Sequence, residues 1–172
     1  MSDMNTIICL YFPVGRLGTA QSGNVLCVSP CFTLVYIINN ANRIINITDI
    51  KNDLDEETQM IVYFLGDKNL YTFNITKDVV IFLKGDISDK IFNNVTKLKN
   101  ELLNRRNIDS TAEELYHYLL SQQIDKSKSK MVIIPDNVLN YIPFEILKNE
   151  NNEYLTENFT VSYSGSIQLY LE

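Results

Sequence analysis

The sequence is poor in the residues that build metal centres and nucleophilic sites. It has one histidine, His117, and three cysteines, which are Cys9, Cys27 and Cys31. A structural metal site needs about four ligands, and the histidine lies far along the chain from the cysteines. We therefore predict no metal and no cofactor. An odd number of cysteines with no signal peptide ahead of them is typical of reduced thiols in a cytoplasm.

An excess of positive charge and a long apolar run are also missing. The formal net charge is −6, so the chain has no basic footprint for nucleic acid or for anionic lipid. No stretch approaches the roughly 20 apolar residues of a membrane span. The apolar segment 6–14 follows an aspartate, where a secretory signal would have lysine or arginine. These absences predict a cytoplasmic protein with no nucleic-acid partner and no membrane partner.

Four Asn-x-Thr sequons stand against that prediction, at Asn46, Asn74, Asn94 and Asn158. They would accept a glycan only in a secreted protein. A chain rich in asparagine, isoleucine and lysine also produces such triplets by chance, and this is the interpretation we adopt.

The chain divides by composition into residues 1–48, a poorly assigned lead-in, and residues 49–172. The lead-in holds all three cysteines and almost no charge. Its short apolar runs at 6–12, 25–28 and 32–38 are separated by turn-like clusters, which predicts either weak strands or a loosely ordered lead-in. Gly15 and Gly18 precede no switch from strand to helix, so a phosphate-binding loop is not expected.

Residues 49–83 predict a helical turn at 50–53 and then a three-strand antiparallel meander. The runs 60–65, 70–75 and 79–83 are rich in Val, Ile, Tyr and Phe, and the gaps between them are built of turn residues. The middle run alternates in a way that fits one buried face: Leu70, Thr72 and Asn74 on one side, and Tyr71, Phe73 and Ile75 on the other.

Two helices are predicted after the meander. Asp86 or Ser88 can cap the first, whose apolar stripe consists of Ile91, Val95, Leu98 and Leu102. The second is predicted to start at Ser110, which forms a capping box with Glu113. Ile108 and Leu115 are placed to hold its start, and its apolar positions are Ala112, Leu115, Tyr116 and Leu119.

A buried strand is predicted at 131–134, because a short uninterrupted apolar run is typical of a strand covered on both faces. Pro135 ends this strand, and Asp136 and Asn137 are turn formers. Pro143 suits the first turn of a helix. Further strands are predicted at 154–155 and 159–163, and a helix start at 164–166.

The string 132–147, Val-Ile-Ile-Pro-Asp-Asn-Val-Leu-Asn-Tyr-Ile-Pro-Phe-Glu-Ile-Leu, resembles the opening signature of CHAT domains, which are caspase-like cysteine-peptidase modules. In that family an apolar strand meets Pro-Asp-Gly, then Leu, then Pro-Phe-Glu and Leu. The segments that follow, and the meander upstream, are similar to the family in order and spacing, so the resemblance covers roughly residues 50–172. The signature residues are Pro135, Asp136, Asn137, Leu139, Pro143, Phe144 and Glu145.

The resemblance implies an α/β fold: an antiparallel three-strand meander plus two helices, followed by the first strand–helix unit of a caspase-like sheet. Asn137 stands where the family usually has glycine, which indicates a backbone position with positive φ that asparagine tolerates. Asp136 and Glu145 have two open interpretations. Either they line a substrate cleft, or they brace the turn through local hydrogen bonds.

In CHAT domains the catalytic His and Cys both follow the signature, at the ends of later strands, and no His or Cys occurs here after Met131. His117 lies in a predicted helix and the cysteines lie in the lead-in, so we assign no catalytic residue. The resemblance therefore implies the N-terminal half of a bacterial peptidase domain, of a family often associated with TPR repeats, that is inactive on its own.

Such a half-domain would leave an unpaired sheet edge and an apolar face. Its expected partner is the missing C-terminal half or another protein. Two alternatives are a standalone protein-interaction module derived from a CHAT peptidase and one half of a split peptidase.

Overall fold

The computed structural model describes residues 7–9, 35–37, 47–66, 68–85 and 88–172. The chain divides into two units, Met1–Asp53 and Leu54–Tyr170. In the first unit, β1 (Ile7–Cys9) pairs antiparallel with β2 (Val35–Ile37), which confirms two of the predicted short strands. The helix α1 (Ile47–Asp53) confirms the predicted helical turn and begins three residues before it. The strand predicted at 25–28 lies outside the described residues, as do Gly15, Gly18, Cys27 and Cys31. The boundary at residue 48 stays a prediction.

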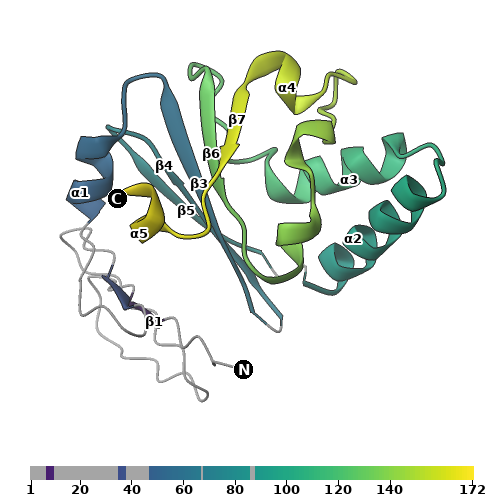
Figure 1. The fold of residues 1–172 in the computed structure, drawn as a ribbon, viewed down its shortest axis with the longest axis horizontal. Helices are drawn as coiled ribbons and strands as arrows, with labels where there is room; N and C mark the ends of the chain where they lie inside the picture. The colour runs from purple at the N-terminus through teal and green to yellow at the C-terminus, as the bar shows by residue number, and fades with distance from the viewer. Residues whose placement is uncertain (1–6, 10–34, 38–46, 67, 86–87) are drawn as a thin grey trace. The chain divides into compact units, whose positions relative to one another are not determined.

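The second unit is built on a mixed sheet of five strands, whose arrangement is shown in Figure 1. Its strand order is β5-β4-β3-β6-β7. The pairs β3–β4 and β4–β5 are antiparallel, whereas β6 runs parallel to β3 and β7 runs parallel to β6. This arrangement confirms the predicted α/β fold with its meander. The strands are β3 (Thr58–Leu65), β4 (Leu70–Ile75), β5 (Val80–Gly85), β6 (Lys130–Ile134) and β7 (Thr160–Tyr163).

Tight turns set the register of the meander. The amide of Gly66 donates to the carbonyl of Asn69 at 2.9 Å, which closes the turn between β3 and β4. At the next turn the Thr76 amide donates to the Val79 carbonyl, and the Thr76 hydroxyl accepts from the Val79 amide at 3.1 Å. Because each turn is closed by the residues that flank it, neighbouring strands pair without a slip.

Two helices, α2 (Ser88–Leu103) and α3 (Asp109–Leu119), lie side by side on one face of the sheet (Figure 1). Ile91, Val95 and Leu98 of α2 are buried as predicted. Leu102 is 41% exposed, so the predicted stripe is wrong at its end. The helix stops at Leu103, and the chain turns away through Arg105 at φ 52°. Asp86 and the side chain of Ser88 lie outside the described residues.

The predicted capping box of α3 is wrong. The helix begins at Asp109, so Ser110 is already inside its first turn. The capping residue is Ile108, whose side chain makes no hydrogen bond to the helix. Asn107 supplies the missing acceptor instead, because its Oδ1 accepts from the Asp109 amide at 2.7 Å. An asparagine side chain satisfies a free helix amide as well as serine does. The apolar positions of α3 (Ala112, Leu115, Tyr116 and Leu119) are buried as predicted.

Strand β4 is buried on both faces, which corrects the prediction of one buried face. Thr72 and Asn74 are as buried as Phe73 and Ile75. Asn74 lies beneath the helices, where its Nδ2 donates to Gln59 Oε1 at 3.0 Å and to the Gln123 carbonyl. Polar side chains in this strand therefore do not mark a solvent face, because partners in the core satisfy them. The sequon at Asn74 is consequently inaccessible in the folded chain, where this residue is 1% exposed.

The segment after β6 is less regular than predicted. β6 is buried from Met131 to Ile134, which confirms a strand covered on both faces. It leads into two single 3₁₀ turns, η1 (Asn137–Tyr141) and η2 (Phe144–Ile146), in place of one helix. The strand predicted at 154–155 is reduced to a single antiparallel bridge between Tyr154 and Lys148. Leu155 already begins α4 (Leu155–Asn158), whose Glu157 carboxylate accepts from the Tyr154 amide at 2.8 Å.

The last predicted helix start is confirmed. The hydroxyl of Ser166 accepts from the Leu169 amide at 3.1 Å, and α5 (Ile167–Tyr170) follows directly. None of the described helices is long and apolar enough to cross a bilayer.

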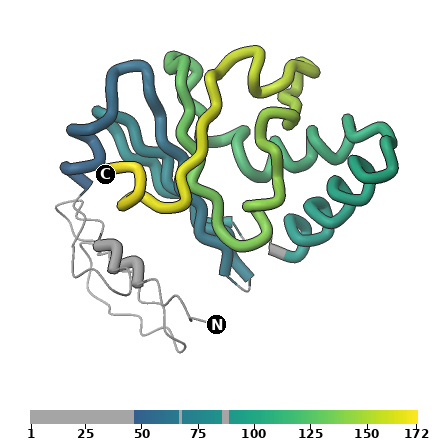
Figure 2. The backbone as a smooth tube through the Cα atoms, viewed as in Figure 1, coloured from purple at the N-terminus to yellow at the C-terminus, as the bar shows by residue number. Residues whose placement is uncertain are grey.

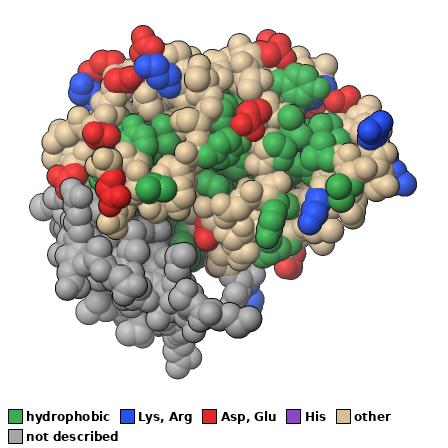
Figure 3. Space-filling model, in the orientation of Figure 1, with side chains coloured by type: hydrophobic (Ala, Val, Ile, Leu, Met, Phe, Trp, Pro, Cys, Tyr) green, Lys and Arg blue, Asp and Glu red, His purple; other side chains and the backbone are tan. Residues whose placement is uncertain are grey.

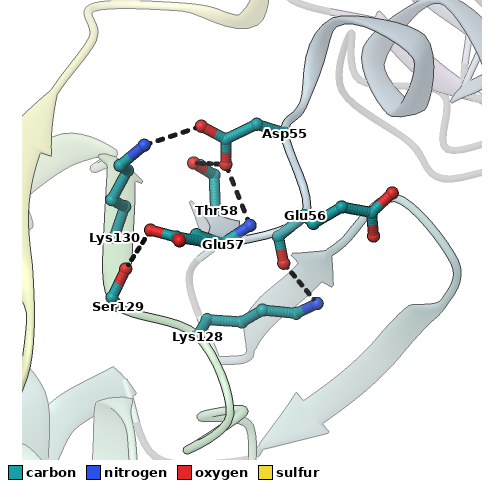
Figure 4. A network of polar contacts seen from close by, with 7 residues as sticks. All are labelled: Asp55, Glu56, Glu57, Thr58, Lys128, Ser129 and Lys130. Carbon is teal, nitrogen blue, oxygen red and sulfur yellow. Dashed lines mark hydrogen bonds and ion pairs between the residues drawn. The ribbon is translucent and has the colours of Figure 1, made fainter.

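A polar network ties the amino end of β3 to the amino end of β6 (Figure 4). One oxygen of Asp55 accepts from the Glu57 amide at 3.0 Å and from the Thr58 hydroxyl at 2.6 Å. The other pairs with Lys130 Nζ at 2.7 Å. The Ser129 hydroxyl donates to Glu57, and Lys128 donates to the Glu56 carbonyl. The ammonium group of Lys130 and the Thr58 hydroxyl lower the pKa of Asp55 to about 2.

Because the pKa of Asp55 in the fold lies below its ordinary value of 3.8, its contribution is complete above that value and is lost as pH falls toward about 2. We expect Asp55→Asn to lower the free energy of unfolding at neutral pH, and the gap from wild type to close in acid. Urea unfolding at several pH values measures this gap. Glu56→Gln serves as a control, and a gap that does not change with pH would contradict the assignment.

Candidate functional site

The carboxyl ends of β3, β6 and β7 lie at one edge of the sheet, because the three strands run in the same direction (Figures 1 and 2). We call this the carboxyl edge and define it by Leu65, Asp136, Asn137, Tyr163 and Ser164. In α/β sheets, ligand and substrate sites form at such an edge. The predicted signature segment leaves β6 here, so the carboxyl edge is the candidate site.

Asp136 connects two strands at the carboxyl edge. Its Oδ2 accepts from the Leu65 amide at 2.8 Å, across a separation of 71 residues. The side chain is half-buried. Burial raises the pKa of Asp136, and the amides of Leu65 and Asn137 oppose that shift. The bracing of Asp136 is therefore long-range and not confined to its own turn.

Asn137 has a φ of 52°, as the substitution of asparagine for glycine predicts. It begins η1 directly after the extended Asp136, and the Leu139 amide donates to the Asp136 carbonyl at 3.0 Å. This reversal takes the chain from the buried strand to the outside of the sheet. Pro135 ends the strand just before it, and Leu139 returns to the core with no exposed surface.

The Pro-Phe-Glu part of the signature is joined to β7. Phe144 is fully buried, and its ring lies 5.6 Å from the ring of Tyr63 and 6.3 Å from that of Tyr163. The Tyr163 hydroxyl donates to Glu145 Oε2 at 2.6 Å and accepts from the Phe144 amide at 2.9 Å. Burial and the Glu145 carboxylate raise the pKa of Tyr163. Pro143 precedes η2 and is half-buried.

Tyr163 belongs to the candidate site through its hydrogen bonds to Phe144 and Glu145, and sequence reasoning missed it. It was visible only as the aromatic end of a predicted strand, and nothing in its spacing from Glu145 indicates a hydrogen bond. The signature residues thus form two groups. Asp136 and Asn137 belong to the ends of β3 and β6, whereas Phe144 and Glu145 are fastened to β7.

His117 and the cysteines do not enter this site within the described residues. His117 is exposed on α3. Cys9 lies in β1, and the other two cysteines are outside the described residues. Where the structure is described, no group of three His, Cys, Asp or Glu side chains is arranged to hold a metal ion. The absence of a catalytic residue stays a prediction.

Hydrophobic side chains also reach the surface around α2, α3 and the segment between β6 and β7 (Figure 3). Tyr141 is 69% exposed and Tyr163 is 44% exposed. The ammonium group of Lys99 lies 5.5 Å from the centre of the Tyr141 ring. Aromatic surface therefore borders the carboxyl edge.

The sequence model of the CHAT domain family matches residues 109–172. This segment is part of a CHAT domain. The CHAT match begins with the first residue of α3 and includes β6, all seven signature residues and β7. No curated protein matches the chain.

The CHAT segment does not contain its whole sheet. Its first strand, β6, pairs with β3, which lies outside the match. The meander therefore completes the sheet on which the CHAT signature is displayed.

The negative charge of Asp136, as distinct from its hydrogen bond to the Leu65 amide, is expected to cost stability at neutral pH. Its raised pKa means that the ionised form is less stable in the fold than in the unfolded chain, above the ordinary value of 3.8. Asp136→Asn removes the charge and keeps an oxygen for the Leu65 amide. We expect unfolding in urea at neutral pH to show equal or higher stability than wild type, with the difference vanishing in acid. Asp136→Ala, which leaves the amide unpaired, should cost about 1–3 kcal/mol. A marked loss in Asp136→Asn would contradict this.

The backbone at Asn137 gives a separate prediction. Glycine adopts positive φ without strain, so Asn137→Gly should raise the free energy of unfolding by about 0.5 kcal/mol. Asn137→Val should lower it by about 1–2 kcal/mol, because a β-branched side chain disfavours this conformation. The two variants are compared by thermal and urea unfolding. Equal stabilities would show that the turn does not depend on this residue.

Proposed function

We propose that this chain supplies the first part of a caspase-like cysteine-peptidase domain and has no peptidase activity by itself. The observation that carries the proposal is the CHAT match over residues 109–172, whose signature lies at the carboxyl edge and is bonded to the strands on both sides. On the same proposal, the protein works in a bacterial cytoplasm, with TPR repeats in its wider assembly.

The chemistry of the carboxyl edge supports the proposed inactivity. A cysteine peptidase needs a thiolate and an imidazole within hydrogen-bond reach of each other. The polar side chains described at this edge and on Pro-Phe-Glu are carboxylates, an amide and hydroxyls: Asp136, Asn137, Glu145, Tyr163 and Ser164. His117 lines a groove together with Glu150, and none of the residues that line this groove belongs to those that define the carboxyl edge.

A peptidase assay tests this proposal on the full 172-residue chain. Casein and a panel of fluorogenic peptides serve as substrates, and we expect no turnover above the blank. The control is the triple variant Cys9→Ala, Cys27→Ala and Cys31→Ala. Turnover that disappears in this variant would overturn the proposal, whereas turnover that survives in it comes from a contaminant.

A second candidate function, binding of a protein partner, is favoured by β7. Among the described strands β7 pairs only with β6, and Thr160, Ser162 and Tyr163 are exposed. The Ser164 amide donates to the Ile133 carbonyl of β6, and the Thr160 amide donates to the carbonyl of Ser129, the residue just before β6. The backbone groups of Val161 and Tyr163 therefore point away from β6 and are placed to pair with another strand. A standalone interaction module and one half of a split peptidase would both use this unpaired side of β7.

Sedimentation at several concentrations, together with a thermal unfolding curve, separates these functions. A soluble monomer with one cooperative melting transition favours the standalone module. Association that grows with concentration favours a half-domain that requires a partner. Sequencing the transcript past the codon for Glu172 then decides whether the reading frame supplies a His-Gly strand and a later Cys strand.

A further inference from the structure

The carboxyl-terminal end of α2 places large hydrophobic side chains on the surface. Leu102 and Leu103 are both exposed, Leu103 by 73%. Lys99 lies one helical turn earlier on the same face, because residues three and four apart on a helix are neighbours. The ammonium group of Lys99 lies 5.5 Å from the centre of the exposed Tyr141 ring, so Tyr141 of η1 extends this face.

Positive charge accompanies these hydrophobic side chains. Residues 97–106 contain four basic residues and one acidic residue, Glu101, so this stretch has a formal charge of +3 in a chain whose net charge is −6. Arg105 and Arg106 are exposed, and their guanidinium groups have no hydrogen-bond or ion-pair partner among the described residues. The side chain of Glu101 is only 16% exposed. In Figure 3, basic and hydrophobic side chains lie next to one another over α2. We call this the α2-end surface and define it by Lys99, Leu102, Leu103, Arg105, Arg106 and Tyr141.

The backbone holds the two arginines against the last turn of α2. The Arg105 amide donates to the Leu102 carbonyl at 3.2 Å, and the Arg106 amide donates to the Glu101 carbonyl at 2.9 Å. This pair of bonds is a Schellman motif, whose residue of positive φ is usually glycine. Arg105 occupies that position at φ 52°, a conformation that any residue with a side chain disfavours. The fold therefore keeps an arginine where glycine would fit better, and its charge is positioned before a partner binds.

The composition of the α2-end surface indicates the kind of partner. Tyrosine and arginine are enriched among the residues that contribute most to protein–protein binding, and the two leucines add apolar area. Unpaired positive charges beside them favour a partner that carries carboxylates, because complementary charge steers and orients binding. An anionic membrane or a nucleic acid fits less well, since both depend on a broad positive field and the chain as a whole is negative.

We propose that the α2-end surface binds an acidic segment of another protein, one that carries large apolar side chains among its carboxylates. The carboxylates pair with Arg105 and Arg106, and the apolar side chains pack against Leu102, Leu103 and Tyr141. The surface contains no residue of β7 and none of those that define the carboxyl edge. Binding there is therefore independent of the proposed peptidase role and of a strand added to β7.

The test is a selection from a displayed library of random short peptides on the full 172-residue chain. Peptides that also bind R105Q/R106Q are removed, and the affinities of individual synthetic peptides are then measured by fluorescence anisotropy. We expect the selected peptides to be rich in Asp and Glu and to carry Leu, Phe or Trp. Selected peptides without acidic residues, or the failure of every peptide to discriminate the two proteins, would overturn the proposal.

Variants then locate the binding of one selected peptide. R105Q/R106Q should weaken it about fivefold or more, since two exposed ion pairs are lost. Leu103→Ser and Tyr141→Ser should each weaken it about fivefold, as loss of a central apolar contact predicts. All of these side chains are exposed, so the melting temperature should stay close to that of wild type. An unchanged affinity in both serine variants would contradict an apolar contact.

The matched control is K68Q/K126Q, which removes the same charge from two other exposed lysines and should leave the affinity unchanged. Equal losses in the two double variants would refute a specific surface. Sedimentation of the chain alone tests a second copy as the occupant, and phosphatidylserine vesicles and a single-stranded oligonucleotide test the other anionic partners. We expect none of them to bind in a way that R105Q/R106Q abolishes. Self-association, vesicle binding or oligonucleotide binding that this variant abolishes would overturn the acidic-peptide proposal.

Discussion

The parallel pairing of β3 with β6 holds the second unit together. It runs from Thr58 opposite Lys130 to Val62 opposite Ile134. Side-chain bonds fasten it at both ends: Asp55 to Lys130 at the amino end, and Asp136 to the Leu65 amide at the carboxyl end. Every other element of this unit depends on that pair, because the meander extends from β3 on one side and the CHAT segment from β6 on the other.

Sequence patterns predicted the elements that rest on local chemistry. Runs of β-branched and aromatic residues located β3, β4 and β5, and turn residues between them set the connections. The positive φ of Asn137 followed from its place in a Pro-Asp-Gly turn. In each case the determinant lies within a few residues of the position that it controls.

The failures of prediction have long-range or competing causes. Asn74 looked like a residue on a half-exposed strand, but it is buried and donates hydrogen bonds to Gln59 and Gln123 in the core. Ser110 had the pattern of a cap, but Asn107 was available three residues earlier. The bond from Tyr163 to Glu145 and the bond from Leu65 to Asp136 join segments that only the fold brings together. A single sequence contains no signal for such pairs.

The order of the strands also sets the order of folding. The meander closes through contacts a few residues apart, whereas β6 must find β3 across about 70 intervening residues. Such a non-local step is slow, since much chain entropy is lost before the contact forms. During synthesis the meander is complete well before β6 emerges. The hydrophobic surface of the meander is therefore exposed until the CHAT segment covers it. During that time this surface is the part of the chain most open to chaperone binding or to aggregation.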